Sequence, residues 1–370
     1  MRTKTDPLLF WTIVGLMVLG VLYALSTGGV AELRFGSRTH YFVRQFSWAL
    51  VSAALMQVVR KEDYRYWNRH VVAYGGAALC AVLLVGVYLA DPRSHRWLRA
   101  GYIGLQPSEM TKVALVVYLS YELAHTRSSA RFPARIAVVV AILTTLVLAA
   151  DMGTFFVLLA VALAMVWVAG LPARKVMAVI AVLLLATMIG IVSEPYRLAR
   201  VAVFFQLKPE GTGRLARYLR QSSAPQTGYQ VRQSLIAVGS GGVLGRGFNQ
   251  SRQKLLFLPE CQTDFVFSVM AEELGLLGCL TALGGFCVIV WRGLATAMRT
   301  RDAFGRYLAV GATLAIGFQA LLNISVALGM FPTQGVPLPL LSYGGSSLVV
   351  TGVMSGLLLS VAERPEVEPL

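Results

Sequence analysis

Residues that carry the chemistry of soluble enzymes are scarce in this 370-residue sequence. Charged residues make up only 14%, and there are four cysteines and four histidines. Three of the cysteines fall inside apolar runs, which argues against a disulfide framework and against a cysteine-based metal site. The histidines lie in separate predicted loops without metal-ligand spacing. The cysteines are Cys80, Cys261, Cys279 and Cys287, and the histidines are His40, His70, His95 and His125.

Long apolar runs are the main feature that is present. Hydrophobic residues make up 56%, and several runs are long enough to cross the ~30 Å hydrocarbon layer as helices. They show no period of two, which a transmembrane barrel would need. The sequence predicts an all-α polytopic membrane protein of about ten transmembrane helices, at about 8–27, 41–59, 71–90, 106–126, 136–150, 154–170, 176–192, 264–290, 307–330 and 344–362.

One long segment, 194–263, has no convincing membrane span. We expect it to form an extracytoplasmic loop within a single membrane domain of residues 1–370. The loops after the second, fourth, sixth and eighth predicted helices are basic. Those after the first and third also hold arginines, but those after the fifth and ninth hold no Lys or Arg, and this asymmetry places both termini in the cytosol. We expect no cleaved signal, because the first apolar run is too long and no small-residue site follows it. The net charge of +15 then reflects topology and the long loop, and we expect no nucleic-acid partner.

This topology brings four features to the outer face. They are the start of the helix at 106, the turn at Asp151, the start of the helix at 264, and the Pro/Gly-rich connection 332–343. We therefore expect a shared cavity that opens outward. Asp151 is either a second carboxylate of the outer face or the cap of the helix that follows it, and we expect the cap, because aspartate readily accepts from the first free backbone N–H groups.

Asp264 stands where a basic stretch turns into an apolar one. A charge at the bilayer centre costs ~2.5–3.5 kcal/mol, so an acid at the mouth of a membrane helix needs a reason. Without a Ser/His or Cys/His arrangement beside it, nucleophilic hydrolysis is not indicated. A lone carboxylate close to cations suits general-base work or ion coordination. The alternative is a helix N-cap.

Three other groups of polar residues could bind a substrate, each with a structural alternative. Glu109 and Lys112 follow Arg96-Trp97 and share a helical face, which also suits a structural ion pair. The 194–263 segment is rich in cations and includes Arg214, Arg217 and Arg220 at intervals of three, which also suits a helix lying on anionic headgroups. The connection that contains Ser342 has hydroxyl groups that suit either phosphate binding or packing.

Five stretches resemble, together and in order along most of the chain, the SEDS family (shape, elongation, division and sporulation) of bacterial envelope proteins, which includes RodA and FtsW. They are QPSEMTKVAL, DMGTFFVLLA, GYQVRQSLIAVGSGGVLGRGF, LPECQTDFVFSVMAEELGLLG and VPLPLLSYGGSS. The resemblance implies a ten-helix glycosyltransferase of the bacterial inner membrane. It implies polymerisation of lipid II, the undecaprenyl-diphosphate-linked disaccharide peptide, on the outer face beside a class B penicillin-binding protein.

The resemblance also assigns residues. The carboxylate of the family's Pro-Glu-x-x-Thr-Asp motif falls on Asp264, which is expected to be the catalytic general base. Glu109, Lys112, Arg96 and Trp97 fall on two further motifs. The residues expected to bind substrate are Glu109, Lys112, Arg96, Trp97, Arg252, Lys254, Glu260, Ser342, Tyr343 and Ser346. We expect no organic cofactor and leave open a divalent cation, Mg²⁺ or Mn²⁺.

Two departures from the family pattern affect the site. Gln262 stands where similar sequences usually have His, and Ala150 stands where they usually have Pro. The motifs point to two different branches of the family. Residues 251–254 and 332–335 resemble the division proteins, whereas residues 336–339 resemble the elongation proteins, and we favour division. Two alternatives to a polymerase are a lipid II flippase and a non-catalytic scaffold for a penicillin-binding protein.

Overall fold

The computed structural model describes residues 6–91, 96–100, 103–126, 134–170, 174, 188, 195–205, 224–255 and 257–364. Within these residues the chain is helical apart from its loops and one two-stranded antiparallel sheet, which confirms the predicted all-α class. The predicted helix at 176–192 lies outside the described residues except for Met188. Arg214, Arg217 and Arg220 also lie outside them.

The first three predicted membrane helices are present within one or two residues of their expected bounds. The N-terminus of the first one is capped by the side chain of Asp6, which accepts from the backbone N–H of Leu9 at 3.2 Å, and Pro7 opens the helix. Two short helices occupy the connections. These elements are α1 (Pro7–Ser26), α2 (Gly28–Phe35), α3 (His40–Lys61), the 3₁₀ helix η1 (Tyr64–Trp67) and α4 (His70–Ala90).

A short hairpin and three helices form the middle of the chain. Leu98 pairs with Leu105 in the hairpin, which leads directly into a helix opened by Pro107. Asp151 caps the last of the three helices, as predicted. These elements are β1 (Leu98–Ala100), β2 (Ile103–Leu105), α5 (Pro107–His125), α6 (Ala134–Ala150) and α7 (Met152–Val168).

The C-terminal part contains two amphipathic helices and three long apolar ones. The helix expected at 264–290 begins at Val266, continues to Arg299 and is interrupted at Gly275, where φ is 64° and ψ is −158°. The predicted membrane helix is therefore present, and the break at Gly275 is a feature that was not predicted. These elements are α9 (Pro195–Phe204), α11 (Ala224–Ser240), α12 (Val266–Arg299), α13 (Ala303–Ala327) and α14 (Gly345–Ala362).

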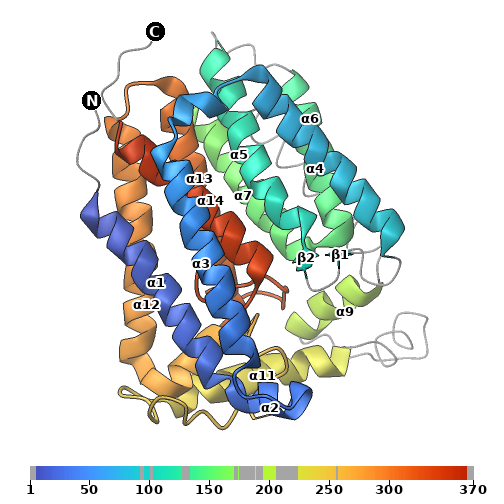
Figure 1. Ribbon diagram of the computed structural model, residues 1–370. Coiled ribbons are helices and arrows are strands. Elements are labelled where there is room, and N and C mark those ends of the chain that lie inside the picture. Colours follow the sequence, from blue (N-terminus) through green and yellow to red (C-terminus); the bar gives the residue numbers. More distant parts are fainter. Residues whose placement is uncertain are drawn as a thin grey trace.

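The helices divide into central and peripheral ones (Figure 1). α13 and α14 are mostly buried and pack against α5 and α3, whereas less than half of the residues of α1, α3, α4 and α12 are buried and each of these helices has exposed apolar side chains. Six helices are long and apolar enough to cross a membrane, and α6 and α7 are shorter apolar helices. Exposed leucine and valine side chains around a helical bundle are what a lipid environment requires.

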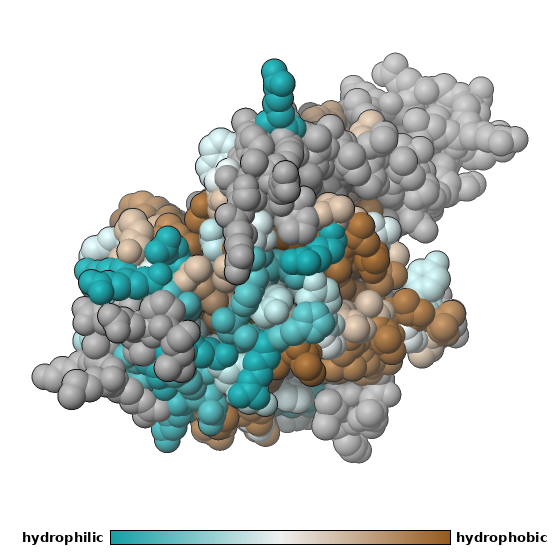
Figure 2. All heavy atoms as spheres, turned by 90° about the horizontal axis from the view of Figure 1, so that it is seen from above, coloured by the Kyte–Doolittle hydropathy of each residue, from teal (hydrophilic) through white to brown (hydrophobic). Residues whose placement is uncertain are grey.

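The two ends of the bundle differ. α1 begins and α14 ends at one end, where Arg60 pairs with Glu363 and Arg292 with Asp6. Figure 2 looks onto this end and shows hydrophilic residues gathered in a band with hydrophobic residues beside them. The hairpin, α9 and α11 lie at the opposite end (Figure 1).

Candidate active site

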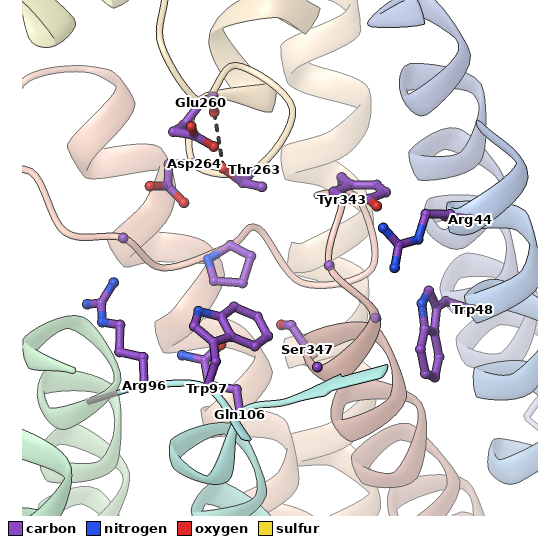
Figure 3. Close-up of a pocket in the computed structure, with 15 residues that line it drawn as sticks. Arg44, Trp48, Arg96, Trp97, Gln106, Glu260, Thr263, Asp264, Tyr343 and Ser347 are labelled. Atoms are coloured by element: carbon purple, nitrogen blue, oxygen red, sulfur yellow. Dashed lines mark hydrogen bonds between the residues drawn. The ribbon is translucent and has the colours of Figure 1, made fainter. Parts of the chain in front are cut away.

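A cavity of about 440 Å³ lies where the hairpin, α3 and the segments before α12 and α14 come together. Figure 3 shows Asp264 and Glu260 on one side of it, Arg96 and Trp97 from the hairpin side, and Arg44 and Trp48 from α3. The turn at Asp151 and the start of α5 lie against the same cavity, because Gln106 lines it and donates to Asp151 at 3.0 Å. The four features that were expected to share a cavity therefore lie together, and the opening of that cavity to the outer face stays a prediction.

Asp264 precedes α12 and borders this cavity. The N-cap of α12 is Phe265, and the cap makes no side-chain hydrogen bond, so Asp264 does not cap the helix. Its backbone N–H donates to the carbonyl of Glu260 at 3.1 Å, and Asn323 donates to its carbonyl at 2.9 Å. Its carboxylate accepts no hydrogen bond from the described residues. The backbone is therefore fixed, while the carboxylate is left for a ligand.

The surroundings of Asp264 shift the pKa of its carboxyl group. Burial among protein atoms raises the pKa of Asp264 to about 7, even though its side chain is partly accessible from the cavity. The guanidinium groups of Arg96 and Arg200 act in the opposite direction, and the carboxylates of Glu260 and Asp151 raise this pKa further. A carboxylate with a pKa near the working pH is suited to accept a proton during a reaction.

Arg96 connects the cavity to the start of α7. Its Nη2 donates to Asp151 at 3.1 Å, and its Nε donates to the carbonyl of Ala150 at 3.0 Å. Asp151 is 1% exposed and also accepts from the N–H of Gly153 at 3.1 Å. The prediction that Asp151 caps the following helix is confirmed. Its second function is to hold Arg96 at the cavity wall.

Trp97 lies in the cavity wall beside the hairpin. A Cβ atom on Gly104 would lie 3.2 Å from its indole ring, so the ring packs directly on the strand backbone. The hydroxyl of Ser346 donates to the carbonyl of Gly104 at 2.8 Å and accepts from the N–H of Gln106 at 3.3 Å. Ser346 thus fastens the hairpin to α14, and it does not line the cavity that contains Asp264.

The connection 332–343 supplies another part of the wall. Ser342 is buried, and its hydroxyl donates to the carbonyl of Thr263 at 2.5 Å and accepts from the N–H of Leu338 at 2.8 Å. The next residue, Tyr343, faces the cavity. Burial raises the pKa of the Tyr343 phenol, and Arg44 beside it partly offsets this effect. Ser342 therefore supports the backbone, whereas Tyr343 lines the cavity together with Gly335 and Pro337 of the same connection.

Two polar residues of α13 donate hydrogen bonds to the irregular backbone of the 332–343 connection. Neither was identified from the sequence. Asn323 donates to the carbonyl of Val336 at 2.7 Å, and Gln319 donates to that of Pro337 at 2.8 Å. Irregular backbone at membrane depth requires such partners. The signal that identifies them is two amides spaced by four in an apolar run, which places them on one helical face.

Glu109 and Lys112 lie apart from this cavity. They form a buried ion pair of 2.7 Å in the first turns of α5, and Lys112 also hydrogen-bonds Gln319 of α13. Neither residue lines the cavity. The geometry is that of the structural alternative, and direct binding of substrate by this pair stays a prediction.

The three residues predicted in the segment before α12 separate in space. Glu260 lines the cavity and has φ of 54°, and the amide of Gln262 donates to its carboxylate at 3.1 Å. Arg252 is exposed. Lys254 is buried and forms an ion pair of 2.7 Å with Glu273. Glu260 is therefore the member of this group that faces the same space as Asp264.

Arg44 and Trp48 line the cavity and were not among the predicted site residues. Both belong to α3, and Figure 3 shows them on the side of the cavity opposite Arg96. The signal for Arg44 was present in the sequence, because an arginine inside a membrane helix is costly unless it faces a wet cavity. Together with Arg96, it makes the cavity positively charged on two sides.

Comparison with known proteins identifies relatives over nearly the whole chain. The family model of the FtsW/RodA/SpoVE cell cycle proteins matches residues 7–366. A probable peptidoglycan glycosyltransferase FtsW of Geobacter metallireducens is 34% identical over 99% of this chain and 96% of its own. One of the same name from Halorhodospira halophila is 38% identical over 96% of this chain and 90% of its own.

Solved structures agree with the fold. A chain from a peptidoglycan synthase complex that coordinates polymerization and crosslinking has a TM-score of 0.76 at 25% identity, covering 97% of this chain and 98% of that one. The rod shape determining protein RodA of Thermus thermophilus has a TM-score of 0.69 at 24% identity, covering 99% of each chain. The chain therefore belongs to the FtsW/RodA/SpoVE family, and it is a peptidoglycan glycosyltransferase of that family.

Proposed function

We propose that this protein polymerises lipid II into glycan strands at the outer face of the bacterial inner membrane, with Asp264 as the general base. In this orientation, both termini of the protein would lie in the cytosol. The cavity would open on the other side, at the end of the bundle away from the termini. The basic loops after alternate helices support this orientation.

The observation that carries the proposal is the pairing of a polar cavity with an apolar groove. A groove of about 320 Å³, lined almost wholly by apolar side chains of α4, α5 and α14, adjoins the cavity. Trp48 and Gly104 line both. A polar space beside an apolar one suits an amphiphile, whose sugar and diphosphate would lie near Asp264 and whose polyprenyl chain would lie in the groove.

The reaction is a displacement at the anomeric carbon of the donor. A sugar hydroxyl of the acceptor forms the new C–O bond and gives its proton to Asp264. The bond from the anomeric carbon to the diphosphate oxygen breaks, and undecaprenyl diphosphate leaves with the electron pair. The unpaired carboxylate and its pKa of about 7 support this role, because the base is available as the hydroxyl becomes acidic.

Charge on the departing diphosphate needs positive partners in the cavity. Arg44 and Arg96 supply guanidinium groups, which bind phosphate oxygens in a fixed fork geometry. The phenol of Tyr343 can donate a hydrogen bond, since burial keeps it protonated. Preorganised donors of this kind stabilise developing charge without further reorganisation. Lys112 was also expected here; it does not line this cavity, and its contact with the substrate stays a prediction.

Few side chains of the described residues could coordinate a divalent cation. Within the described part of the chain, no three His, Cys, Asp or Glu side chains are grouped to hold a metal. Asp264 and Glu260 face one cavity, and Mg²⁺ is commonly held by one or two carboxylates together with substrate phosphates. With Asp264 kept free as the base, Glu260 would be the carboxylate that holds Mg²⁺ or Mn²⁺ together with the diphosphate, whose charge the ion would neutralise.

A penicillin-binding protein of class B would be the partner that cross-links the glycan. The related solved chain comes from a synthase complex that couples polymerization to crosslinking, which supports such a partner. The curated relatives named FtsW support the division branch over the elongation branch.

Asp264→Asn tests the proposal with purified protein and lipid II. A general base contributes roughly 10²–10⁴-fold, so turnover should fall by about that factor while the protein stays folded. Asp63→Asn is the matched control, because Asp63 is exposed beside η1 and away from the cavity. Normal glycan chains from Asp264→Asn would reject the role of Asp264. Lipid II transfer across vesicles without polymer would instead indicate a flippase, and partner function without polymer a scaffold.

A further inference from the structure

The helix that follows Asp264 is not continuous. Because α12 is interrupted at Gly275, residues 266–274 form a short helix of their own. Residues 276–299 rise about 36 Å at 1.5 Å per residue, which is enough to cross the hydrocarbon layer without the first part. Asp264 therefore directly precedes a short helix, and the backbone conformation of the joint at Gly275 sets the direction of that helix.

The backbone of a neighbouring loop closes this joint. The N–H of Leu276 donates to the carbonyl of Gly242 at 2.9 Å, and the N–H of Gly247 donates to the carbonyl of Glu273 at 2.9 Å. A broken helix leaves such groups without partners, and buried groups need them. A Cβ atom on Gly275 would lie 2.3 Å from the nitrogen of Gly245, so the two backbones touch with no side chain between them.

Two fully buried glutamates at the joint hold the segment that leads to Asp264. Glu273 accepts from Lys254 Nζ at 2.7 Å and from the hydroxyl of Ser26 in α1 at 2.7 Å. Glu272 accepts from the hydroxyl of Ser251 at 2.5 Å and from the N–H of Arg252 at 3.0 Å. Residues 251–254 are thus fastened both to the joint and to α1.

The chain reaches the cavity at Glu260, six residues after Lys254, and Asp264 lies ten residues after Lys254. The N–H of Leu258 donates to the carbonyl of Gln253 at 2.8 Å, which folds the intervening chain back on itself. At its far end, the carbonyl of Thr263 accepts from Ser342. Asp264 therefore lies between two fixed points, the 332–343 connection on one side and the buried pair of Lys254 and Glu273 on the other.

We propose, building on the role given above to Asp264, that Glu273 is a positioning residue for the transfer reaction. Through its buried ion pair with Lys254, it fixes the loop and the short helix that hold Asp264 at the cavity. Replacing a buried ion pair by apolar residues is often neutral for stability, so the pair's contribution is to specify geometry. Lys254 contributes as the partner of Glu273 and does not bind substrate.

The double variant Lys254→Met/Glu273→Met tests this, because it removes both charges and leaves neither one buried and unpaired. The matched control is Arg60→Met/Glu363→Met, which removes an ion pair of 2.5 Å at the opposite end of the bundle. For each protein, the melting temperature, kcat and KM on lipid II, and the dependence of kcat on pH are measured.

We expect the Lys254/Glu273 variant to fold and to lose roughly 10²-fold in kcat, the loss that a displacement of about 1 Å produces. Its pH of half-maximal rate should also move, since Asp264 would change its distance from Arg96, Arg200, Asp151 and Glu260. The control should keep both the rate and the pH profile. A purely structural role would lower the amount of folded protein without moving that profile.

Wild-type kcat and an unmoved pH profile in the double variant would overturn the proposal. If that variant does not fold, Ser26→Ala takes its place, because it removes one hydrogen bond from Glu273 and leaves the ion pair. A smaller loss of kcat with a moved profile is then expected, and an unchanged rate and profile would again overturn it. Glycan synthesis by Asp264→Asn would reject both this proposal and the role of Asp264, whereas an inactive Asp264→Asn beside a fully active double variant would reject the positioning role alone.

Discussion

Arg96 and Asp264 approach the same glycine. A Cβ atom on Gly335 would lie 3.3 Å from Nη1 of Arg96 and 3.5 Å from Oδ2 of Asp264. The guanidinium lowers the pKa of the carboxyl group, while burial raises it to about 7. The absence of a side chain at Gly335 thus lets a cation and the proposed base share one wall of the cavity.

Gly335→Val should therefore reduce turnover more than stability. The added methyl groups would displace Arg96 or Asp264, and a misplaced catalytic group can cost up to about 10²-fold. Rates of polymerisation and melting temperatures are compared with those of Gly15→Val, a change on the exposed face of α1 where nothing lies within 4 Å of a Cβ atom. Equal rates for the two variants would contradict the prediction.

The pH profile should report the protonation of Asp264. Because the deprotonated form is the base, the rate should rise with pH and reach half its maximum near pH 7. Glu260→Gln removes a neighbouring negative charge and should move this midpoint to lower pH, whereas Arg96→Gln removes a positive charge and should move it to higher pH. Initial rates of each variant across the pH range check this, and shifts of the same sign would be inconsistent with it.

The same raised pKa predicts a stability cost. The folded protein holds the proton on Asp264 up to about pH 7, whereas an unfolded chain releases it near the ordinary aspartate pKa of 3.8. Ionisation therefore destabilises the fold progressively between these pH values and fully above the higher one. Asp264→Asn should melt at a higher temperature than wild type at about pH 8, and the difference should shrink toward about pH 4. A thermal shift series in detergent measures it, and a constant difference would contradict the assignment.

The apolar groove should determine the affinity for the lipid chain. Gly76 lines it, and a side chain there would enter open space. Gly76→Leu should raise KM for lipid II several-fold with little change in kcat, because it removes binding shared by ground and transition states. Gly75→Leu is the matched control, since Gly75 neighbours it on α4, is exposed and does not line the groove. A substrate with a short lipid chain should not distinguish the two variants.

Most helix positions, and the segments that lie beside Asp264, could be predicted from the sequence. Apolar run length set against bilayer thickness placed α1, α3, α4, α5, α13 and α14 within a few residues. The cost of a charge at a helix mouth singled out Asp264, and the alternation of crossings placed Asp151, Gln106 and the 332–343 connection beside it. These predictions depend on the local sequence and on the number of membrane crossings. Neither requires knowing which helices are in contact.

Which polar side chains share a space was decided by the tertiary structure. Lys254 and Arg252 stand two residues apart, yet one is buried against Glu273 and the other is exposed. Lys112 turns to Glu109 and Gln319, while Arg44 of α3 enters the cavity instead. A side chain reaches only what packs within a few ångströms of it. Helix periodicity gives the face on which a residue lies but not the neighbour that meets that face.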